Sequence, residues 1–229
     1  DLEAHVSTDT VIATNTSSLS VSELATVLKH PERFIGMHFF NPVTRMPLVE
    51  IIPTPHTNPQ TIATAVATVK RFDKTPLVVK DKAGFLVNRI VVPGMIEAVL
   101  LLQEGVGMER IERLVVDFGN PMGPFELSDE VGNDVTYKAS KNLEVAYSPL
   151  IAAPALLKAM YEEKLLGRKV GAGFYVYNGK KKSPNKQVQR LLKKIKTEHK
   201  VISDDTIFAR IIYGMINESA RCLEEGIVS

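Results

Sequence analysis

Two titratable side chains stand inside segments that are otherwise apolar. His38 lies in "IGMHFF", and Glu50 lies twelve residues later in "LVEII". If both segments are strands that pair antiparallel around the turn "NPVTRMP", residues whose numbers sum to 88 face each other, so that His38 lies opposite Glu50. A carboxylate in that place fixes the tautomer and orientation of the imidazole, as a general base requires. The spacing alone favours the structural alternative, a buried His–Glu hydrogen bond that holds the turn.

Three further polar residues stand where predicted elements begin or end. Ser17 follows the strand-like segment "VIATNT" and precedes a predicted helix, and open α/β sheets bind ligands at the carboxyl ends of their strands. Asn41 follows the segment that contains His38, and Asn88 begins an apolar helical segment. Each has an ordinary structural alternative, since Ser17 would cap the helix, Asn41 would form a turn before proline, and Asn88 would be a polar helix end.

The elements that must position these residues change in kind along the chain. Up to about residue 83, strand-like and helical segments alternate, and Ser20 and Glu23 have the S-x-x-E spacing of a helix start, so an α/β layer structure is predicted. From residue 84 onward, apolar residues recur at helical spacing in "FLVNRIVVPGMIEAVLLLQEGV" and in several later segments. The basic, proline-containing segment 179–186 is expected to be a linker. The predicted fold class is therefore α/β followed by all-α.

Two helical segments of the chain resemble each other. A shift of 121 positions superimposes identical residues that include Arg89, Ile90, Glu97, Glu104 and Gly105 in the first segment and Arg210, Ile211, Glu218, Glu225 and Gly226 in the second. These matches predict a duplicated helical unit. Asn88 falls on an alanine under this shift, so it belongs to only one of the two segments.

Composition and charge exclude several classes of protein. The 229 residues are 45% hydrophobic, and the net charge of +2 gives no strong reason for nucleic-acid binding. The single cysteine cannot form an intramolecular disulfide, and the apolar runs are too short to span a bilayer. The histidines are scattered, without H-x-x-x-H or C-x-x-C spacing, so no metal site is expected.

Two basic or glycine-rich segments are weaker candidates for binding. The stretch from Lys180 to Lys196 could touch lipid or nucleic acid, but an apolar stripe beneath it favours a packed helix with a solvated lysine face. The segment "GRKVGAGF" lacks the spacing of a phosphate-binding loop and is interpreted as a glycine-rich turn.

Six motifs occur in the order and spacing seen in one known family. They are "NTSSL", "GMHFFNPV", "MPLVE", "KAGFLVNR", "GNPMGPFEL" and "GRKVGAGFY". The most specific are "HFFNP" and "PMGPFEL", and the set extends over essentially the whole chain. The chain therefore resembles the L-3-hydroxyacyl-CoA dehydrogenase family, which implies part of a Rossmann-type NAD-binding domain followed by a helical C-terminal domain.

The resemblance implies roles for individual residues. His38 matches the family's catalytic histidine, and Glu50 matches its partner glutamate. His38 would take the proton from the 3-hydroxyl of an acyl-CoA while a hydride leaves C3 for NAD, and Glu50 would orient the imidazole. The other implied site residues are Ser17 and Asn88 for the substrate and Ser17, Asn41 and Lys169 for the NAD cofactor.

The sequence also departs from the single-function enzymes of the family. It contains no strand, G-x-G-x-x-G and helix for the dinucleotide, and it continues beyond "GAGFYVYNG". This layout resembles the large multifunctional β-oxidation proteins, such as the α-subunit of the bacterial fatty acid oxidation complex. We therefore expect a fragment with little activity alone, made of a partial NAD-binding domain (1–83), a helical dehydrogenase domain (84–178), and a linker with the start of a second helical repeat (179–229).

The same resemblance implies partners and a compartment. The implied partners are a 3-hydroxyacyl-CoA substrate, a thiolase subunit in the parent complex, and a second copy that dimerises through the helical part, with neither nucleic acid nor an integral membrane segment. The implied location is the bacterial cytoplasm, or mitochondria or peroxisomes in a eukaryote. Two alternatives stay open: a short-chain 3-hydroxybutyryl-CoA dehydrogenase, and a non-enzymatic helical assembly module.

Overall fold

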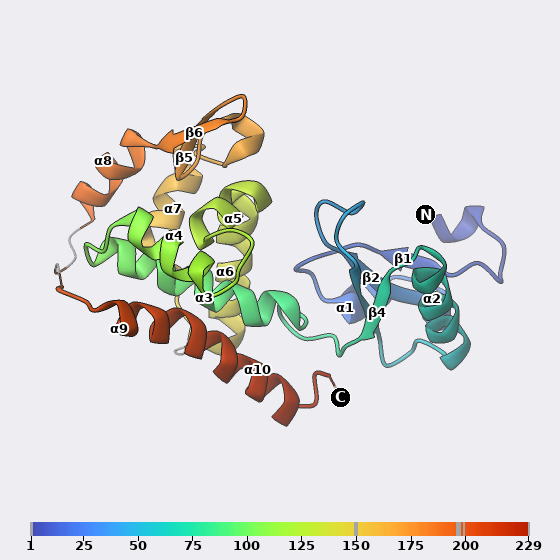
Figure 1. Cartoon of the computed structure of the whole chain (residues 1–229). Helices are drawn as coiled ribbons and strands as arrows, with labels where there is room; N and C mark the ends of the chain where they lie inside the picture. Colours follow the sequence, from blue (N-terminus) through green and yellow to red (C-terminus); the bar gives the residue numbers. More distant parts are fainter. Residues whose placement is uncertain (1, 149–150, 196–197, 199, 229) are drawn as a thin grey trace. The chain divides into compact units, whose positions relative to one another are not determined.

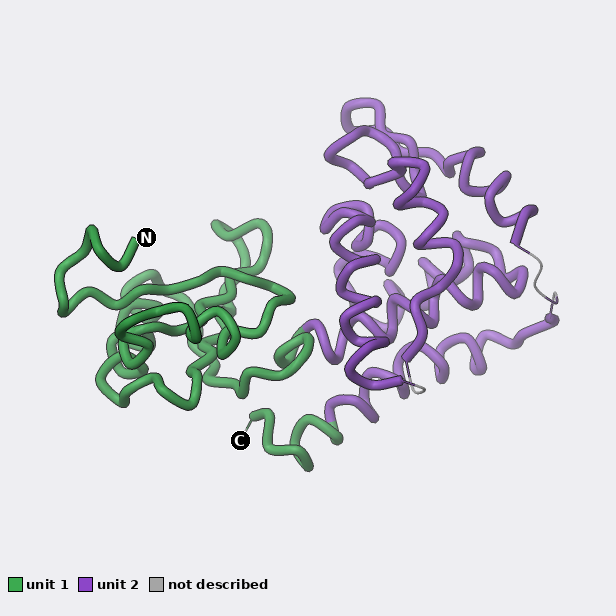
Figure 2. Tube along the Cα trace, turned by 180° about the vertical axis from the view of Figure 1, so that it is seen from behind, with its two compact units in different colours: residues 1–87, 220–229 green, residues 88–219 purple. Residues whose placement is uncertain are grey.

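The computed structural model describes residues 2–148, 151–195, 198 and 200–228, and the chain forms two compact units (Figure 2). Unit 1 comprises Asp1–Val87 and Ala220–Ser229, and unit 2 comprises Asn88–Ser219. Unit 1 is an α/β structure and unit 2 is mainly helical, which confirms the predicted fold class.

A four-stranded sheet forms the centre of unit 1 (Figure 1). Its strands, in spatial order, are β1 (Ile12–Thr14), β2 (Phe34–Phe39), β3 (Leu48–Pro53) and β4 (Thr75–Val78). β1 pairs parallel with β2, β2 pairs antiparallel with β3, and β3 pairs parallel with β4. The parallel pairs need crossover connections. These connections contain the helices α1 (Val21–Ala25) and α2 (Pro59–Arg71). Two short 3-10 helices, η1 (Leu2–His5) and η2 (Pro31–Arg33), precede β1 and β2 respectively.

The two faces of this sheet carry different residues because successive side chains of a strand point to opposite sides. One face packs against α2 through an apolar core formed by Ile35, Val49, Ile51, Ala65 and Val69. On the other face, a Cβ added to Gly36 would lie 2.9 Å from both Val21 and Ile52, so the glycine admits the close approach of α1. His38 lies two residues after Gly36 on β2, and Glu50 lies two residues before Ile52 on β3. The side chains of His38 and Glu50 therefore point to the same face as Gly36 and Ile52, which is the α1 face.

Unit 2 is built around one long helix. Its helices are α3 (Val87–Gln103, whose first residue belongs to unit 1), α4 (Met108–Asp117), α5 (Pro124–Val131), α6 (Asn133–Tyr147), α7 (Ala155–Glu162), η3 (Arg168–Val170), α8 (Lys186–Lys194), α9 (Asp204–Phe208), η4 (Ala209–Tyr213) and α10 (Gly214–Glu224, which runs on into unit 1). In α3, Ile96, Ala98, Val99 and Leu101 are all buried, so burial extends over more than half of the helix circumference.

The segment 179–186 differs from its prediction. The sequence predicts a linker, whereas β5 (Tyr175–Asn178) and β6 (Lys181–Pro184) pair antiparallel across this segment and α8 follows directly. Asn185, between β6 and α8, is buried, and its side-chain amide donates to the Gly173 carbonyl oxygen at 2.8 Å. The linker prediction was wrong because backbone pairing and one buried amide hold a segment whose composition is typical of loops.

The two arginines matched by the internal repeat exchange ion pairs. Arg89 Nε lies 3.3 Å from Glu218 Oε2, and Arg210 Nε lies 2.9 Å from Glu97 Oε2. Glu97 and Glu218 also correspond under the shift, so each arginine contacts the repeated glutamate of the other segment. Such reciprocal contacts are what a two-fold relation between helices produces. They support the duplication, which stays a prediction.

Replacing Arg89 by leucine is expected to destabilise the protein more than the same change at Arg210. Arg89 is 2% exposed, and its guanidinium also donates to the Tyr147 hydroxyl at 3.1 Å. Its loss removes the cation beside the buried Glu218 carboxylate and should cost about 3–5 kcal/mol. The Arg210 side chain is 28% exposed, and solvent screening reduces the expected cost there to about 1 kcal/mol. Urea unfolding of both variants checks this, and equal destabilisation would contradict it.

Burial raises the pKa of Glu112 on α4. Its Oε1 accepts the backbone N–H groups of Phe125 (3.1 Å) and Glu126 (3.0 Å) at the start of α5, and it accepts the Tyr175 hydroxyl at 3.3 Å. A folded-state pKa above the unfolded value near 4.5 means that this group contributes most stability below that value, and the contribution is lost as pH rises through the folded-state pKa.

The variant Glu112→Gln is expected to gain unfolding free energy relative to the parent as pH rises from about 4 to 7. The glutamine oxygen can accept the same three hydrogen bonds, while the cost of a buried charge disappears. Urea unfolding at a series of pH values measures the difference. Glu109→Gln, at an exposed position of the same helix, is the matched control. Identical pH dependence in Glu112→Gln and the parent would be the contrary result.

Candidate active site

His38 and Glu50 lie directly opposite each other on β2 and β3, in the register that the sequence predicts. His38 Nδ1 is 2.7 Å from Glu50 Oε2, and the two residues are 6% and 0% exposed. An ionised carboxylate can only accept hydrogen bonds, so Nδ1 carries the hydrogen and donates it. The Nε2 of the neutral ring is then left to accept a proton, which is the arrangement of a base with an orienting carboxylate.

The second oxygen of Glu50 holds the start of α3. Glu50 Oε1 accepts the backbone N–H groups of Leu86 and Val87, each at 2.9 Å. The preceding residues turn the chain toward the carboxylate, and Phe85 is held at a φ of +47°, which is strained for a residue with a side chain. The helix N-terminus favours negative charge at this place. Glu50 therefore keeps both the imidazole and the entry into α3 in position.

The carboxyl ends of β1 and β2 lie at the same edge of the sheet because these strands are parallel. Ser17 follows β1, Asn41 follows β2, and His38 is the next-to-last residue of β2. Asn15 joins the two strand ends, since its Oδ1 accepts the Phe39 N–H at 2.9 Å. The structure thus brings the loop of Ser17, the buried His38 and the exposed Asn41 to the edge where such sheets bind ligands.

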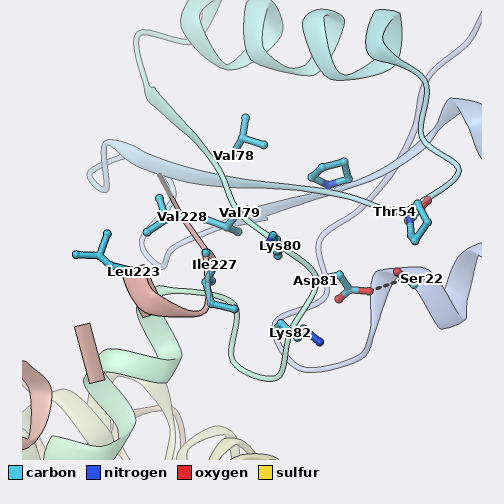
Figure 3. Close-up of a pocket in the computed structure, with 13 residues that line it drawn as sticks. Ser22, Thr54, Val78, Val79, Lys80, Asp81, Lys82, Leu223, Ile227 and Val228 are labelled. Atoms are coloured by element: carbon cyan, nitrogen blue, oxygen red, sulfur yellow. Dashed lines mark hydrogen bonds between the residues drawn. The ribbon is translucent and has the colours of Figure 1, made fainter. Parts of the chain in front are cut away.

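Asp81 holds the N-terminus of α1, which follows the loop that contains Ser17. Its carboxylate accepts the Ser20 hydroxyl at 2.8 Å and the backbone N–H groups of Val21 at 3.2 Å and Ser22 at 2.6 Å. Figure 3 shows Asp81 pointing toward Ser22. Sequence reasoning missed both Asp81 and Asn15. The available signal was that each is a polar residue shortly after a strand. The hydrogen-bond partners of Asp81 and Asn15 depend on tertiary structure, which the sequence pattern does not give.

A pocket of about 790 Å³ lies beside Asp81 at the carboxyl ends of β3 and β4 (Figure 3). Its lining includes Thr54, Val79, Lys80 and Ile227, all from unit 1. His38 and Glu50 do not line it. The pocket is therefore separate from the proposed base and its carboxylate.

The sheet edge beside His38 fits the nicotinamide end of NAD. The hydroxyl of Ser17 and the amide of Asn41 can both donate to and accept from a carboxamide. A pyrophosphate instead binds at a helix N-terminus behind a glycine-rich loop. The helix after β1 is α1, and the carboxylate of Asp81 already occupies its N-terminal N–H groups. The described residues therefore fit the nicotinamide end without offering a pyrophosphate cradle at α1.

The two remaining predicted site residues belong to unit 2. Asn88 is the second residue of α3 and directly follows Val87, whose N–H is bound by Glu50. Lys169 lies in η3, where its exposed ammonium forms an ion pair with Asp134 of α6. Their roles toward substrate and cofactor stay predictions.

Asp129 lies two residues after the motif "PMGPFEL" and contacts the motif "GAGFY". The buried carboxylate accepts the backbone N–H groups of Phe174 and Tyr175, both at 2.9 Å, and the Tyr177 hydroxyl at 3.0 Å. A Cβ at Gly173 would lie 1.9 Å from Asp129 Oδ1, so only glycine fits there. Burial raises the pKa of Asp129, and this network joins α5 to the β5–β6 hairpin. Its role is structural.

Over the described ranges, no group of three or more His, Cys, Asp or Glu side chains could hold a metal ion. No helix in the same part of the chain has the length and apolar character needed to cross a membrane.

Comparison with known proteins places both units in one family. Residues 1–82 match the family described as "3-hydroxyacyl-CoA dehydrogenase, NAD binding domain", and residues 84–177 match "3-hydroxyacyl-CoA dehydrogenase, C-terminal domain". The chain is 43% identical over 228 residues to the fatty acid oxidation complex subunit alpha of Vibrio parahaemolyticus, an alignment that covers 100% of this chain and 32% of that protein. The chain thus spans about a third of the length of the curated relatives that it matches.

Solved structures agree with this placement. The (S)-3-hydroxybutyryl-CoA dehydrogenase PaaH1 from Ralstonia eutropha is 39% identical with a TM-score of 0.72, over 77% of this chain and 64% of that one. The dehydrogenase part of multifunctional enzyme 1 from C. elegans is 32% identical with a TM-score of 0.64, over 100% of this chain and 53% of that one. With its buried His–Glu pair and matches to both domains, the chain belongs to the 3-hydroxyacyl-CoA dehydrogenase family.

Proposed function

We propose that the chain carries the proton-transfer machinery for NAD-dependent oxidation of an L-3-hydroxyacyl-CoA to a 3-oxoacyl-CoA, a step of fatty acid β-oxidation. The observation that carries this proposal is the buried His38–Glu50 pair at the carboxyl edge of the sheet. The pair leaves one imidazole nitrogen available to accept a proton, and alcohol oxidation requires such an acceptor.

Each residue of the proposed site has its own role in the reaction. His38 Nε2 accepts the proton of the 3-hydroxyl group, the C3–O bond becomes a carbonyl, and Glu50 stabilises the imidazolium that results. NAD, when bound, accepts the hydride that leaves C3. Ser17 and Asn88 hold the substrate oxygen so that the hydroxyl points at the imidazole. The cofactor contacts in this proposal come from Ser17, Asn41 and Lys169.

The activity test compares the full-length product of the gene with the 229-residue chain. The full-length product should form NADH from L-3-hydroxybutyryl-CoA. The 229-residue chain should form little, because its sequence has no G-x-G-x-x-G for the pyrophosphate. Robust NADH formation by the 229-residue chain would overturn the expectation that this chain has little activity alone. The absence of NADH formation by the full-length product would overturn the proposed function.

A short-chain 3-hydroxybutyryl-CoA dehydrogenase is the second candidate, favoured by the likeness to the Ralstonia eutropha enzyme. The likeness to a fatty acid oxidation complex subunit favours a multifunctional β-oxidation enzyme instead. Values of kcat/KM across acyl lengths separate them, since a β-oxidation enzyme should retain its kcat/KM as the acyl chain lengthens. A non-enzymatic assembly module has less support, because such a module has no use for a buried base and its carboxylate.

The domain division, partners and compartment also belong to this proposal. We assign 1–83 to a partial NAD-binding domain, 84–178 to the helical dehydrogenase domain, and the part of 179–229 after the strand β6 to the start of a second helical repeat. A thiolase subunit and a second copy of the same chain are the proposed partners, and the bacterial cytoplasm is the proposed location. Size-exclusion chromatography of the full-length product, with and without the thiolase, would detect either assembly.

A further inference from the structure

The charges of this chain are strongly segregated. Residues 164–197 contain eleven Lys and Arg and no Asp or Glu. The rest of the chain therefore holds 17 basic and 26 acidic residues, a net charge of −9, although the whole chain is only +2. The small net charge conceals one segment of +11. Segregation of this size creates a local positive potential that the net charge does not reveal.

The helix α8 presents this charge on one side. At 3.6 residues per turn, Lys186, Arg190, Lys193 and Lys194 fall within an arc of about 100°. The opposite side of α8 carries Val188 and Leu191, which are buried in the core of unit 2. The basic side chains are all exposed. The apolar side of α8 is packed inside unit 2, so only the basic side of the helix is available to an external partner.

The β5–β6 hairpin adds to the same basic segment. Lys180, Lys181 and Lys182 are exposed at its turn and on β6, and Asn185 alone separates β6 from α8. Figure 1 shows the hairpin and α8 along the outer part of unit 2. We call the seven exposed cations of this region the basic face; its members are Lys180, Lys181, Lys182, Lys186, Arg190, Lys193 and Lys194.

The basic face is nearly uncompensated. Lys182 pairs with Glu126 at 2.7 Å. Across the residues that the structure describes, none of the other six forms an ion pair. Clustered cations repel one another, so an arrangement without internal counter-charges favours an external anionic partner.

We propose that the basic face binds the surface of an anionic phospholipid membrane, peripherally and without insertion. Clusters of four to eight Lys and Arg on an amphipathic helix are typical of binding to acidic lipid headgroups. Six of the seven cations are lysines, which act as point charges and suit a diffuse anionic surface more than a bidentate phosphate or carboxylate site. The aromatic residues of the segment, Phe174, Tyr175 and Tyr177, are buried or half-buried, so no stacking platform for nucleic-acid bases is exposed there.

Vesicle sedimentation tests the proposal on the purified chain and on the full-length product. Both should sediment with vesicles of equal parts phosphatidylglycerol and phosphatidylcholine in about 50 mM salt, and neither should with phosphatidylcholine alone. Raising the salt to about 500 mM should abolish binding, because a non-inserted helix gains nothing from apolar burial in the bilayer. The variant K186Q/R190Q/K193Q/K194Q should lower the vesicle partition coefficient by about tenfold or more.

The matched control removes four exposed cations elsewhere, in the variant K70Q/R71Q/R113Q/K138Q. This control should retain at least half of the binding, and circular dichroism should show that both variants are folded. Equal loss in the two variants would overturn the proposal, since net charge rather than the basic face would then matter. No vesicle binding by the parent, or tighter binding to single-stranded RNA than to the vesicles, would overturn it as well. The outcome does not depend on dehydrogenase activity.

Discussion

Replacing His38 by glutamine should lower kcat for oxidation of L-3-hydroxybutyryl-CoA by about 10²–10⁴-fold, with a much smaller change in KM. The glutamine amide can still donate to Glu50 Oε2, so the β2–β3 pairing should survive. It has no nitrogen that can accept the hydroxyl proton. Initial rates of NADH formation by the full-length product measure this effect.

The control for His38 is His56→Gln, at an exposed histidine of the same unit. It should leave kcat within about twofold of the parent, as is usual for surface substitutions away from a site. Equal activity in His38→Gln and the parent would mean that the buried pair is only structural, the alternative that the spacing of the sequence favours on its own.

Replacing Glu50 by glutamine is expected to lower kcat by about 10²-fold or more with little loss of folded structure. The side-chain oxygen can still accept the N–H groups of Leu86 and Val87. The amide nitrogen would then face His38 Nδ1 as a donor, which forces the ring into the tautomer with hydrogen on Nε2. That tautomer cannot accept a proton at Nε2, the nitrogen that we propose faces the substrate.

The variant Glu50→Ala tests the second role of this carboxylate, which is to hold the start of α3. It leaves the two N–H groups at the start of α3 and the imidazole without their acceptor, and should cost about 3 kcal/mol or more of unfolding free energy. Urea unfolding and kcat should be measured on both variants, with Glu23→Gln as an exposed control. Equal unfolding free energies of Glu50→Ala and the parent would contradict the role of Glu50 in holding α3.

Short-range rules predicted most of unit 1. The alternation around His38 and Glu50 was enough to fix the β2–β3 register, because a slip of one residue would move both side chains to the other face. The capping hydrogen bond from Glu23 N–H to Ser20 Oγ is also as predicted, at 3.2 Å. Rules of this kind work where a feature depends only on chain neighbours.

Features that depend on distant partners could not be predicted. The second oxygen of Glu50 is satisfied by backbone amides 36 and 37 residues away, and backbone amides leave no trace in side-chain patterns. Asp81 reaches α1 across about sixty residues. The lysine-rich β6 resembles a loop in composition, because its exposed edge position allows polar side chains on both faces. The functional assignment of His38 came from the ordered motifs around it rather than from its spacing.

Whether His38 is the proton acceptor can be seen in a crystal structure of the full-length product with acetoacetyl-CoA and NAD. We expect the 3-oxo oxygen to lie within about 3.2 Å of His38 Nε2, while Nδ1 keeps its hydrogen bond to Glu50. A bound acetoacetyl-CoA whose 3-oxo oxygen makes no contact with His38 would contradict it.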